Sequence, residues 1–282
     1  MKYALSSLKF SLLIAASCAL SGCDSLGGLG NTTPASGPDA SQVAAAQANI
    51  ASLSEVIQRN PNSADDYNTR GSAYAGIQRY QDAIADFTKA TQLNPNLASA
   101  YSNRATAHRT QRRDEAALAD YNRAIEVGPN YAPAYLGRGK MHRQQNDLNA
   151  ALTDISRAIQ ISPDMAEAYH ERGLVYQKNG QSQLAISDFD SAIDRNPQVS
   201  APYMARGQSL IATKKYTAAI EDFNRVLNIN SQYSDGWAWL GRAQEGNNMV
   251  KDAAESYNRA LSVDPNNAIA KDGVSRFGRG LR

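Results

Sequence analysis

Apolar residues recur at helical spacing along most of the chain, and the whole pattern of apolar, small and polar positions repeats every 34 residues. With Ala64 as the first position, six consecutive repeats cover 64–97, 98–131, 132–165, 166–199, 200–233 and 234–267. A hairpin turn is expected near the fifteenth position of each repeat. The period therefore predicts stacked, antiparallel helix pairs, each of which buries its apolar face against its neighbours.

Four positions of the repeat keep their residue type in all six copies. The eighth position is Gly or Ala, the twentieth is always Ala, and the twenty-fourth is bulky, from Phe87 to Tyr257. The fourth position is always aromatic: Tyr67, Tyr101, Tyr135, Tyr169, Tyr203 and Trp237. Small residues allow two helices to approach closely, and large rings fill the space between successive pairs. A proline closes five of the six repeats, where it ends one unit and begins the next.

This pattern resembles the tetratricopeptide repeat, whose period and residue types it matches six times over. The resemblance implies an all-α fold, a right-handed superhelical solenoid of stacked antiparallel helix pairs over residues 64–267. Residues 43–63 carry apolar residues at helical spacing and are expected to form an N-terminal capping helix. Residues 268–282 are expected to form a C-terminal cap and tail, with a short helix that stops at the glycines after Phe277.

Arginine occupies the seventh position of the first five repeats, and aspartate occupies the twenty-third position of the same five. The arginines are Arg70, Arg104, Arg138, Arg172 and Arg206, and the aspartates are Asp86, Asp120, Asp154, Asp188 and Asp222. The sixth repeat has Leu240 and Ser256 instead, so both members of the pair are lost together. The two positions lie equally far from the turn, which predicts an internal ladder of ion pairs rather than a basic stripe for an anionic ligand.

In this repeat family the first helix of each pair generally lines a concave groove, which binds protein segments. Carried onto this sequence, the resemblance implies partner-binding roles for Arg109, Lys140, Arg143, His170, Leu174, Met204, Ile211 and Trp239. The groove would be basic and polar in its middle and apolar toward the C-terminus, although Met204 or Trp239 could instead fill a seam between helix pairs. Some family members clamp a chaperone's C-terminal carboxylate with lysine and asparagine, but the corresponding positions here lack the basic residues: Asn68, Ser72, Asn103, Pro133 and Gly137.

The N-terminus resembles the signal peptide of bacterial lipoproteins. Residues 1–22 combine two lysines with a short apolar run, and Leu20-Ser21-Gly22-Cys23 matches the lipobox at all four places. The resemblance implies acylation of Cys23 and cleavage before it; the alternative is a plain secreted protein. Residues 23–42 are rich in Gly, Ser, Thr and Pro, so an acylated cysteine followed by a flexible tether is expected.

Charge and motifs exclude several functions. Loss of the signal peptide would remove two lysines and no acid, which leaves 27 basic and 27 acidic residues and gives no reason to expect nucleic-acid binding. The sequence contains no catalytic motif, so we expect no enzyme activity and no cofactor. His108 and His142 share the eleventh repeat position, where a metal pair is conceivable, but replacement of a core ring is favoured and no metal site is predicted.

These observations predict a lipid-anchored, periplasm-facing scaffold or adaptor that binds segments of other bacterial cell-envelope proteins. The layout is similar to adaptors for peptidoglycan-remodelling enzymes or proteases and equally to accessory lipoproteins of pilus or secretion-apparatus assembly. The sequence leaves open the inner or outer membrane, the identity of the partner, and a homodimer.

Overall fold

The computed structural model describes residues 39–280, with side chains to Arg276, and within this range it contains fourteen α-helices and no strand. The helices are α1 (Ala40–Arg59), α2 (Ala64–Gly76), α3 (Tyr80–Leu93), α4 (Ala98–Thr110), α5 (Asp114–Val127), α6 (Ala132–Gln144), α7 (Leu148–Ile161), α8 (Ala166–Lys178), α9 (Ser182–Arg195), α10 (Ser200–Ala212), α11 (Tyr216–Ile229), α12 (Ser234–Gly246), α13 (Val250–Val263) and α14 (Ala268–Gly280). Each of the six repeats contains one helix pair. The predicted all-α solenoid is confirmed.

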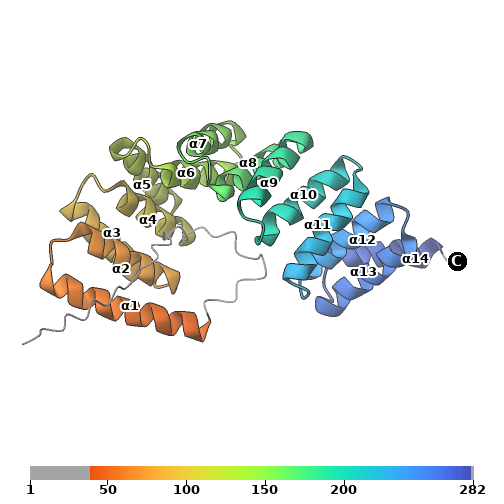
Figure 1. Cartoon of the computed structure of the whole chain (residues 1–282), viewed down its shortest axis with the longest axis horizontal. Coiled ribbons are helices and arrows are strands. Elements are labelled where there is room, and N and C mark those ends of the chain that lie inside the picture. The colour runs from red at the N-terminus through yellow and green to blue at the C-terminus, as the bar shows by residue number, and fades with distance from the viewer. Residues whose placement is uncertain (1–38, 281–282) are drawn as a thin grey trace, which may run out of the picture.

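The helix pairs follow one another along an arc (Figure 1). The first helices of successive repeats contact each other, from α2 with α4 through to α10 with α12. Within the described range, the second helices of successive repeats do not approach each other in this way. The first helices therefore form the tighter, inner side of the curve, and they line the groove.

Every hairpin turn places its fifteenth residue in the left-handed backbone region. The φ values are 62° at Gln78, 58° at Arg112, 65° at Asn146, 72° at Gly180, 59° at Lys214 and 62° at Asn248. The next amide then donates back to a carbonyl five residues earlier, as Arg79 N does to Tyr74 O at 2.9 Å. This bond closes the end of the first helix in a Schellman motif. Glycine is the residue best suited to this conformation, but it is present in only one of these six turns.

The contact between the two helices of a pair depends on the small eighth residue. In repeat four, a Cβ on Gly173 would lie 2.6 Å from Cε1 of Phe189, so the ring occupies the space that a side chain would need. Phe189 itself and Ala185 are completely buried. The small and bulky positions of the repeat are thus complementary parts of one core, and the packing explains why both types recur.

The two ends of the array extend slightly further than expected. Helix α1 begins at Ala40 rather than at residue 43, because the Asp39 side chain accepts a hydrogen bond from the amide of Gln42 and the Gln42 side chain accepts one from the amide of Asp39. Helix α14 continues to Gly280, beyond the expected stop after Phe277. Arg276 fastens α14 to the last repeat through Glu245, with Nη2 2.6 Å from Oε2.

The predicted signal peptide, Cys23 and most of the predicted tether lie outside the described residues. Among the helices of residues 39–280, none combines the length and apolar character that a membrane span requires.

Candidate functional site

The arginine ladder consists of five bidentate ion pairs. In each of the first five repeats, Nε and Nη2 of the arginine donate to the two carboxylate oxygens of the predicted aspartate, at 2.6–2.9 Å. The aspartates are buried, with exposed fractions of 4–8%. The hydrogen-bonded carboxylate raises the pKa of each of these arginines. The prediction of an internal ladder is confirmed.

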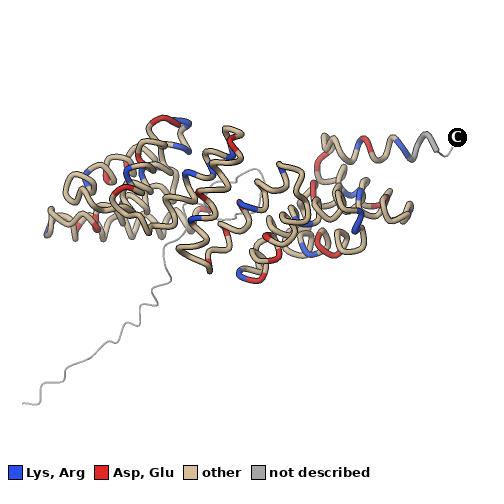
Figure 2. Tube along the Cα trace, turned by 90° about the horizontal axis from the view of Figure 1, so that it is seen from above, with Lys and Arg blue, Asp and Glu red and all other residues tan. Residues whose placement is uncertain are grey.

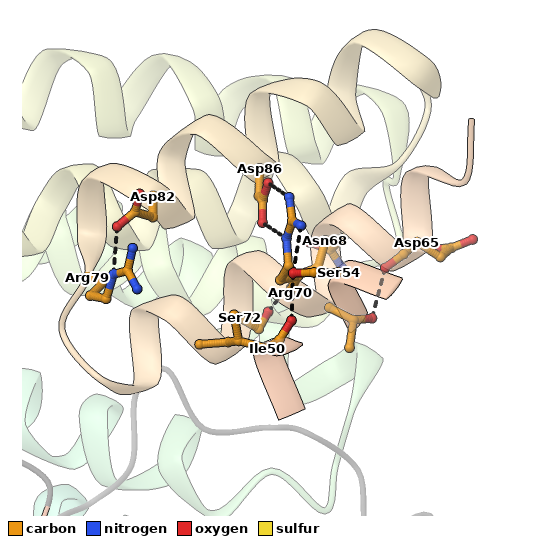
Figure 3. A network of polar contacts seen from close by, with 10 residues as sticks. Ile50, Ser54, Asp65, Asn68, Arg70, Ser72, Arg79, Asp82 and Asp86 are labelled. Carbon is orange, nitrogen blue, oxygen red and sulfur yellow. Dashed lines mark hydrogen bonds and ion pairs between the residues drawn. The ribbon is translucent and has the colours of Figure 1, made fainter. Parts of the chain in front are cut away.

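Each ladder arginine also reaches back to the helix that precedes its own pair, a contact that the sequence analysis missed. Around Arg70, Nη1 donates to Ser54 on α1 while the other nitrogens hold Asp86 on α3 (Figure 3). In the next four repeats Nη1 reaches a polar residue 16 positions earlier: Thr88, Asn122, Ser156 and Asp190. The signal was available as a polar residue at the twenty-fifth position of every preceding repeat. Each arginine therefore joins three consecutive helices.

The aromatic fourth position supports the ladder as well. The guanidinium carbon lies 5.5–5.9 Å from the ring centroid of the tyrosine three residues earlier, from Tyr67 to Tyr203. Such cation–π contacts add to the ion pairs. All five arginines are thus engaged by carboxylates, polar groups and rings, which leaves them unsuited to hold a partner.

The two histidines at the eleventh position lie beside the ladder. His108 Nε2 is 3.9 Å from Asp120 Oδ2, and His142 Nε2 is 3.7 Å from Asp154 Oδ2. Burial lowers the pKa of His108, against the opposing effect of Asp120. No cluster of three or more metal-ligating side chains occurs among the described residues. Both histidines are partly buried beside the ladder, at the repeat position where repeats one and four carry a tyrosine.

The middle of the groove was predicted to be basic, but its basic side chains are matched by acids from the next repeat. Lys140 is ion-paired with Glu167 and lies 3.8 Å from Glu171, while Arg143 Nη2 lies 2.9 Å from Glu171 Oε2. Burial raises the pKa of Glu167, although Lys140 opposes the shift. Basic and acidic residues are likewise interspersed along the array in Figure 2. The groove around α6 and α8 is therefore nearly balanced in charge.

Arg109, by contrast, makes no ion pair within 4 Å in the described part of the protein, and its buried Nε lacks a hydrogen-bond partner. It borders a cavity of about 410 Å³ on the inner side of repeats two to four. This cavity lies where α4, α6 and the beginning of α8 face the groove. Arg109 is thus a predicted groove cation without an ion-pair partner among the described residues, although its charge opposes the rise in the pKa of Glu167.

The predicted apolar residues lie on three successive first helices, α8, α10 and α12. Leu174, Ile211 and Trp239 are partly exposed, whereas Met204 is 9% exposed and belongs to the core cluster around Phe223. Trp239 stacks on Phe223 with ring centroids 6.4 Å apart, and the Arg242 guanidinium lies over its ring. One side of the Trp239 ring thus packs in the core between two helix pairs, and the rest of the ring stays partly exposed on the groove side.

His170 is also a buried residue rather than an exposed groove contact. Its exposed fraction is 6%, its ring lies 5.6 Å from that of Phe189, and its Nδ1 has no hydrogen-bond partner. Burial lowers its pKa to about 4, because the charged form would lose its hydration. His170 is therefore neutral at pH 7 and packs against Phe189 inside the array.

Family models described as tetratricopeptide repeat match most of the six helix pairs. They cover residues 64–97, 102–166, 139–208, 201–233 and 234–267. No curated protein sequence matches this one significantly.

Several solved structures share the fold at low sequence identity. The chain is similar to the Cut9–Hcn1 complex of the APC/C (TM-score 0.69, 19% identity, 79% of this chain), but it spans only 44% of that chain. It is similar to YrrB, described as a TPR protein with an unusual peptide-binding site (TM-score 0.58, 23% identity, 66% of this chain and 96% of that chain). It is also similar to PilW, described as a widely conserved type IV pilus biogenesis factor (TM-score 0.67, 15% identity, 74% and 97%). At these identities the likeness shows the fold alone.

Proposed function

Because this chain belongs to the tetratricopeptide-repeat family, we propose that it is a membrane-anchored, periplasm-facing scaffold that binds segments of other cell-envelope proteins. Peptidoglycan-remodelling enzymes and proteases are the proposed partners. The fold itself is that of a protein–protein interaction scaffold. The location and the partners rest on the sequence of residues 1–42 and on the layout of the repeats behind it.

The observation that carries the proposal is that the array has two distinct sets of side chains, one engaged inside the ladder and one partly exposed in the groove. The ladder residues are consumed by contacts inside the array, which stabilise it without leaving groups free for a partner. The groove residues Arg109, Leu174, Ile211 and Trp239 lie on the inner side and retain exposed surface. Partly exposed aromatic and arginine side chains are the types that dominate binding energy at protein interfaces.

The anchor is proposed from Cys23 and the lipobox. Two or three acyl chains, each contributing about 0.8 kcal/mol per buried methylene, hold a protein stably at a membrane, which a single acyl group does not. Cys23→Ala is expected to leave an unprocessed precursor that takes up no labelled palmitate. A variant that still matures to the wild-type mass and is acylated would remove the lipid anchor from the proposal.

The alternative function is that of an accessory lipoprotein for pilus or secretion-apparatus assembly. The likeness to PilW supports this candidate, because it extends over 97% of that chain. At 15% identity the likeness concerns the fold, so the two functions share one architecture and differ in their partners. No catalytic activity is proposed for either, in keeping with the repeat family's general role.

Site-specific photo-crosslinking in living bacteria tests the function and separates the two candidates. A crosslinking amino acid is placed at Ile211 on the groove side, and the matched control is Leu184, which is 48% exposed on the second helix α9. We expect crosslinks from Ile211 and few from Leu184. Mass spectrometry then identifies wall enzymes and proteases, or pilus and secretion components. Crosslinks from Leu184 alone would place the binding surface outside the groove.

A further inference from the structure

The two end helices of the array are each one half of a helix pair. Helix α1 packs on α2 as a second helix packs on the next repeat, and among the described residues no first helix accompanies it. Helix α14 packs on α12 and α13 as a first helix does, and no described second helix follows it. The two helices lie at opposite ends of the arc (Figure 1). The two halves of a complete pair are therefore available only from two different copies of the chain.

The face of α1 that a first helix would cover is open. In the six complete repeats, the twentieth, twenty-fourth and twenty-seventh positions are buried between the two helices of the pair, with exposed fractions of 0–1%. Counted back by 34 residues from repeat one, the same positions of α1 are Asn49, Leu53 and Val56. Asn49 is exposed, Leu53 is partly exposed and Val56 is 36% exposed. Helix α1 thus carries part of a pair core that no described helix covers.

The open faces of α14 and α1 match in size. Counted on by 34 residues from repeat six, the eighth position of α14 is Ser275, which is larger than the usual Gly or Ala. Leu53 at the twenty-fourth position is smaller than the ring that five of the six repeats carry there, so it leaves room for the serine. The ladder positions are Val274 on α14 and Ser52 on α1. They resemble the leucine and serine of repeat six, and neither member brings a buried charge.

The charges of the two faces are complementary. In repeats two, five and six, the guanidinium carbon of an arginine at the twenty-sixth position lies 5.9–6.0 Å from the ring centroid at the fourth position. These two positions are therefore neighbours across a helix pair. On the end helices the same positions are Glu55 of α1 and Lys271 of α14, both of which are exposed. An acid and a base thus replace the arginine and the ring, and the pairing of α14 with α1 brings opposite charges together.

Both charges are accessible in the single chain. Glu55 lies 3.6 Å from Arg59 in an exposed ion pair, and Lys271 Nζ donates to Asn266 Oδ1 at 3.1 Å on the surface. Exposed contacts of this kind contribute little free energy, so they do not prevent a new ion pair. Arg59 has a match as well, since it occupies the position of Arg195, whose Nε donates to a proline carbonyl of the preceding repeat at 2.7 Å.

We propose that copies of this protein associate head to tail, with α14 of one copy and α1 of the next forming a composite helix pair. Two different surfaces meet in this contact, so it extends into a ring or an open filament instead of closing a symmetric dimer. The solenoid then continues from one copy into the next. The contact uses the ends of the array and leaves the groove untouched, so it is independent of the proposed scaffold function.

Disulfide trapping tests the composite pair in the full chain. In repeats one and six, a Cβ on the eighth-position glycine would lie 3.2 Å from the carbonyl oxygen of the twentieth-position alanine. Asn49→Cys and Ser275→Cys in one chain therefore place two thiols at closely approaching positions of neighbouring copies. After brief oxidation of the purified protein in detergent, a non-reducing gel should show dimers, trimers and larger species. The matched control combines Asn49→Cys with Leu184→Cys, which lies at an exposed position of α9, and should give no such series.

A charge swap tests the register of the contact. Added to the cysteine pair, Lys271→Glu opposes two acids, and the protein concentration that gives half-maximal trapping should rise about fivefold. Adding Glu55→Lys restores opposite charges in the reverse order and should return trapping toward the level of the cysteine pair alone. Melting curves check that each variant is folded.

Absence of trimers and larger species from the folded cysteine pair would overturn the proposal, and so would an equal series from the Leu184→Cys control. Dimers alone would indicate a symmetric contact, and a disulfide within one chain would show that two copies are not needed; each would also overturn it. A series that neither Lys271→Glu nor the swap alters would refute the composite pair, because its register places Lys271 opposite Glu55.

Discussion

Removal of one ladder arginine should destabilise the array because it leaves a buried carboxylate without its ion-pair partner. In Arg172→Leu, the two carboxylate oxygens of Asp188 lose both donors, which lie at 2.8 Å in the wild type. Asp188 is only 6% exposed, so water cannot fully replace the guanidinium. Breaking a fully buried ion pair costs about 3–5 kcal/mol. The Arg172 side chain is 22% exposed, so we expect the lower end, about 3 kcal/mol.

The local nature of the contact determines the assay. Helices of a repeat array unfold in neighbouring groups, so the loss should be greatest in α8 and α9 and in the adjoining α7, which Arg172 reaches through Ser156. Urea titration followed by circular dichroism gives the free energy of unfolding of the array. Hydrogen exchange of backbone amides identifies the helices that open. Uniform loss of protection along the whole array would contradict a local ion pair.

Repeat six supplies the design for rescue. It has Leu240 in place of the arginine, and its Ser256 donates to Gln244 at 2.7 Å instead of accepting from a guanidinium. Adding Asp188→Ser to Arg172→Leu removes the stranded charge, and we expect at least half of the lost free energy to return. A third substitution, Tyr176→Gln, places at the eleventh position of repeat four the glutamine to which Ser256 donates in repeat six, Gln244. A double variant no more stable than Arg172→Leu would refute the reasoning.

The remaining predictions concern pH, the hairpin turns and the groove. The pKa of His170 is about 4 in the folded protein and about 6.5 in the unfolded chain, so the unfolded chain takes up the proton first as the pH falls. The free energy of unfolding should therefore be unaffected by His170 above pH 6.5 and should decrease by up to about 3 kcal/mol between pH 6.5 and 4. His170→Leu should flatten this part of the curve of unfolding free energy against pH. Lys214→Gly should raise the free energy of unfolding by about 1 kcal/mol, because φ is positive at this residue. Gly180→Ala should lower it by a similar amount, although a Cβ there meets nothing within 4 Å. A loss of stability in Lys214→Gly together with a gain in Gly180→Ala would exclude strain in the turns. Trp239→Ala should weaken binding of a crosslinked partner by about 2 kcal/mol in titration without unfolding the array, and unchanged affinity would remove this ring from the binding surface.

The sequence was sufficient to predict the solenoid and the ladder. Both depend on relations that repeat with the period: the small eighth residue faces the bulky twenty-fourth, and the seventh and twenty-third positions lie at the same distance from the turn. Any relation inside one helix pair recurs with every copy, and the loss of Arg and Asp together in repeat six tested the pairing within a single protein. Local helix geometry then fixes the contact.

The groove could be predicted only in outline, because its properties depend on contacts between repeats that do not recur. The family pattern indicated which helix faces inward, but Lys140 and Arg143 are matched by acids of repeat four, of which Glu171 has no acidic counterpart in the other repeats, and Met204 and His170 are buried by neighbours. The cavity beside Arg109 likewise needs Gly137 and Tyr121 from different repeats to face each other. Periodicity determines the scaffold, whereas the exposure and free charge of each groove residue follow from how successive repeats pack in three dimensions.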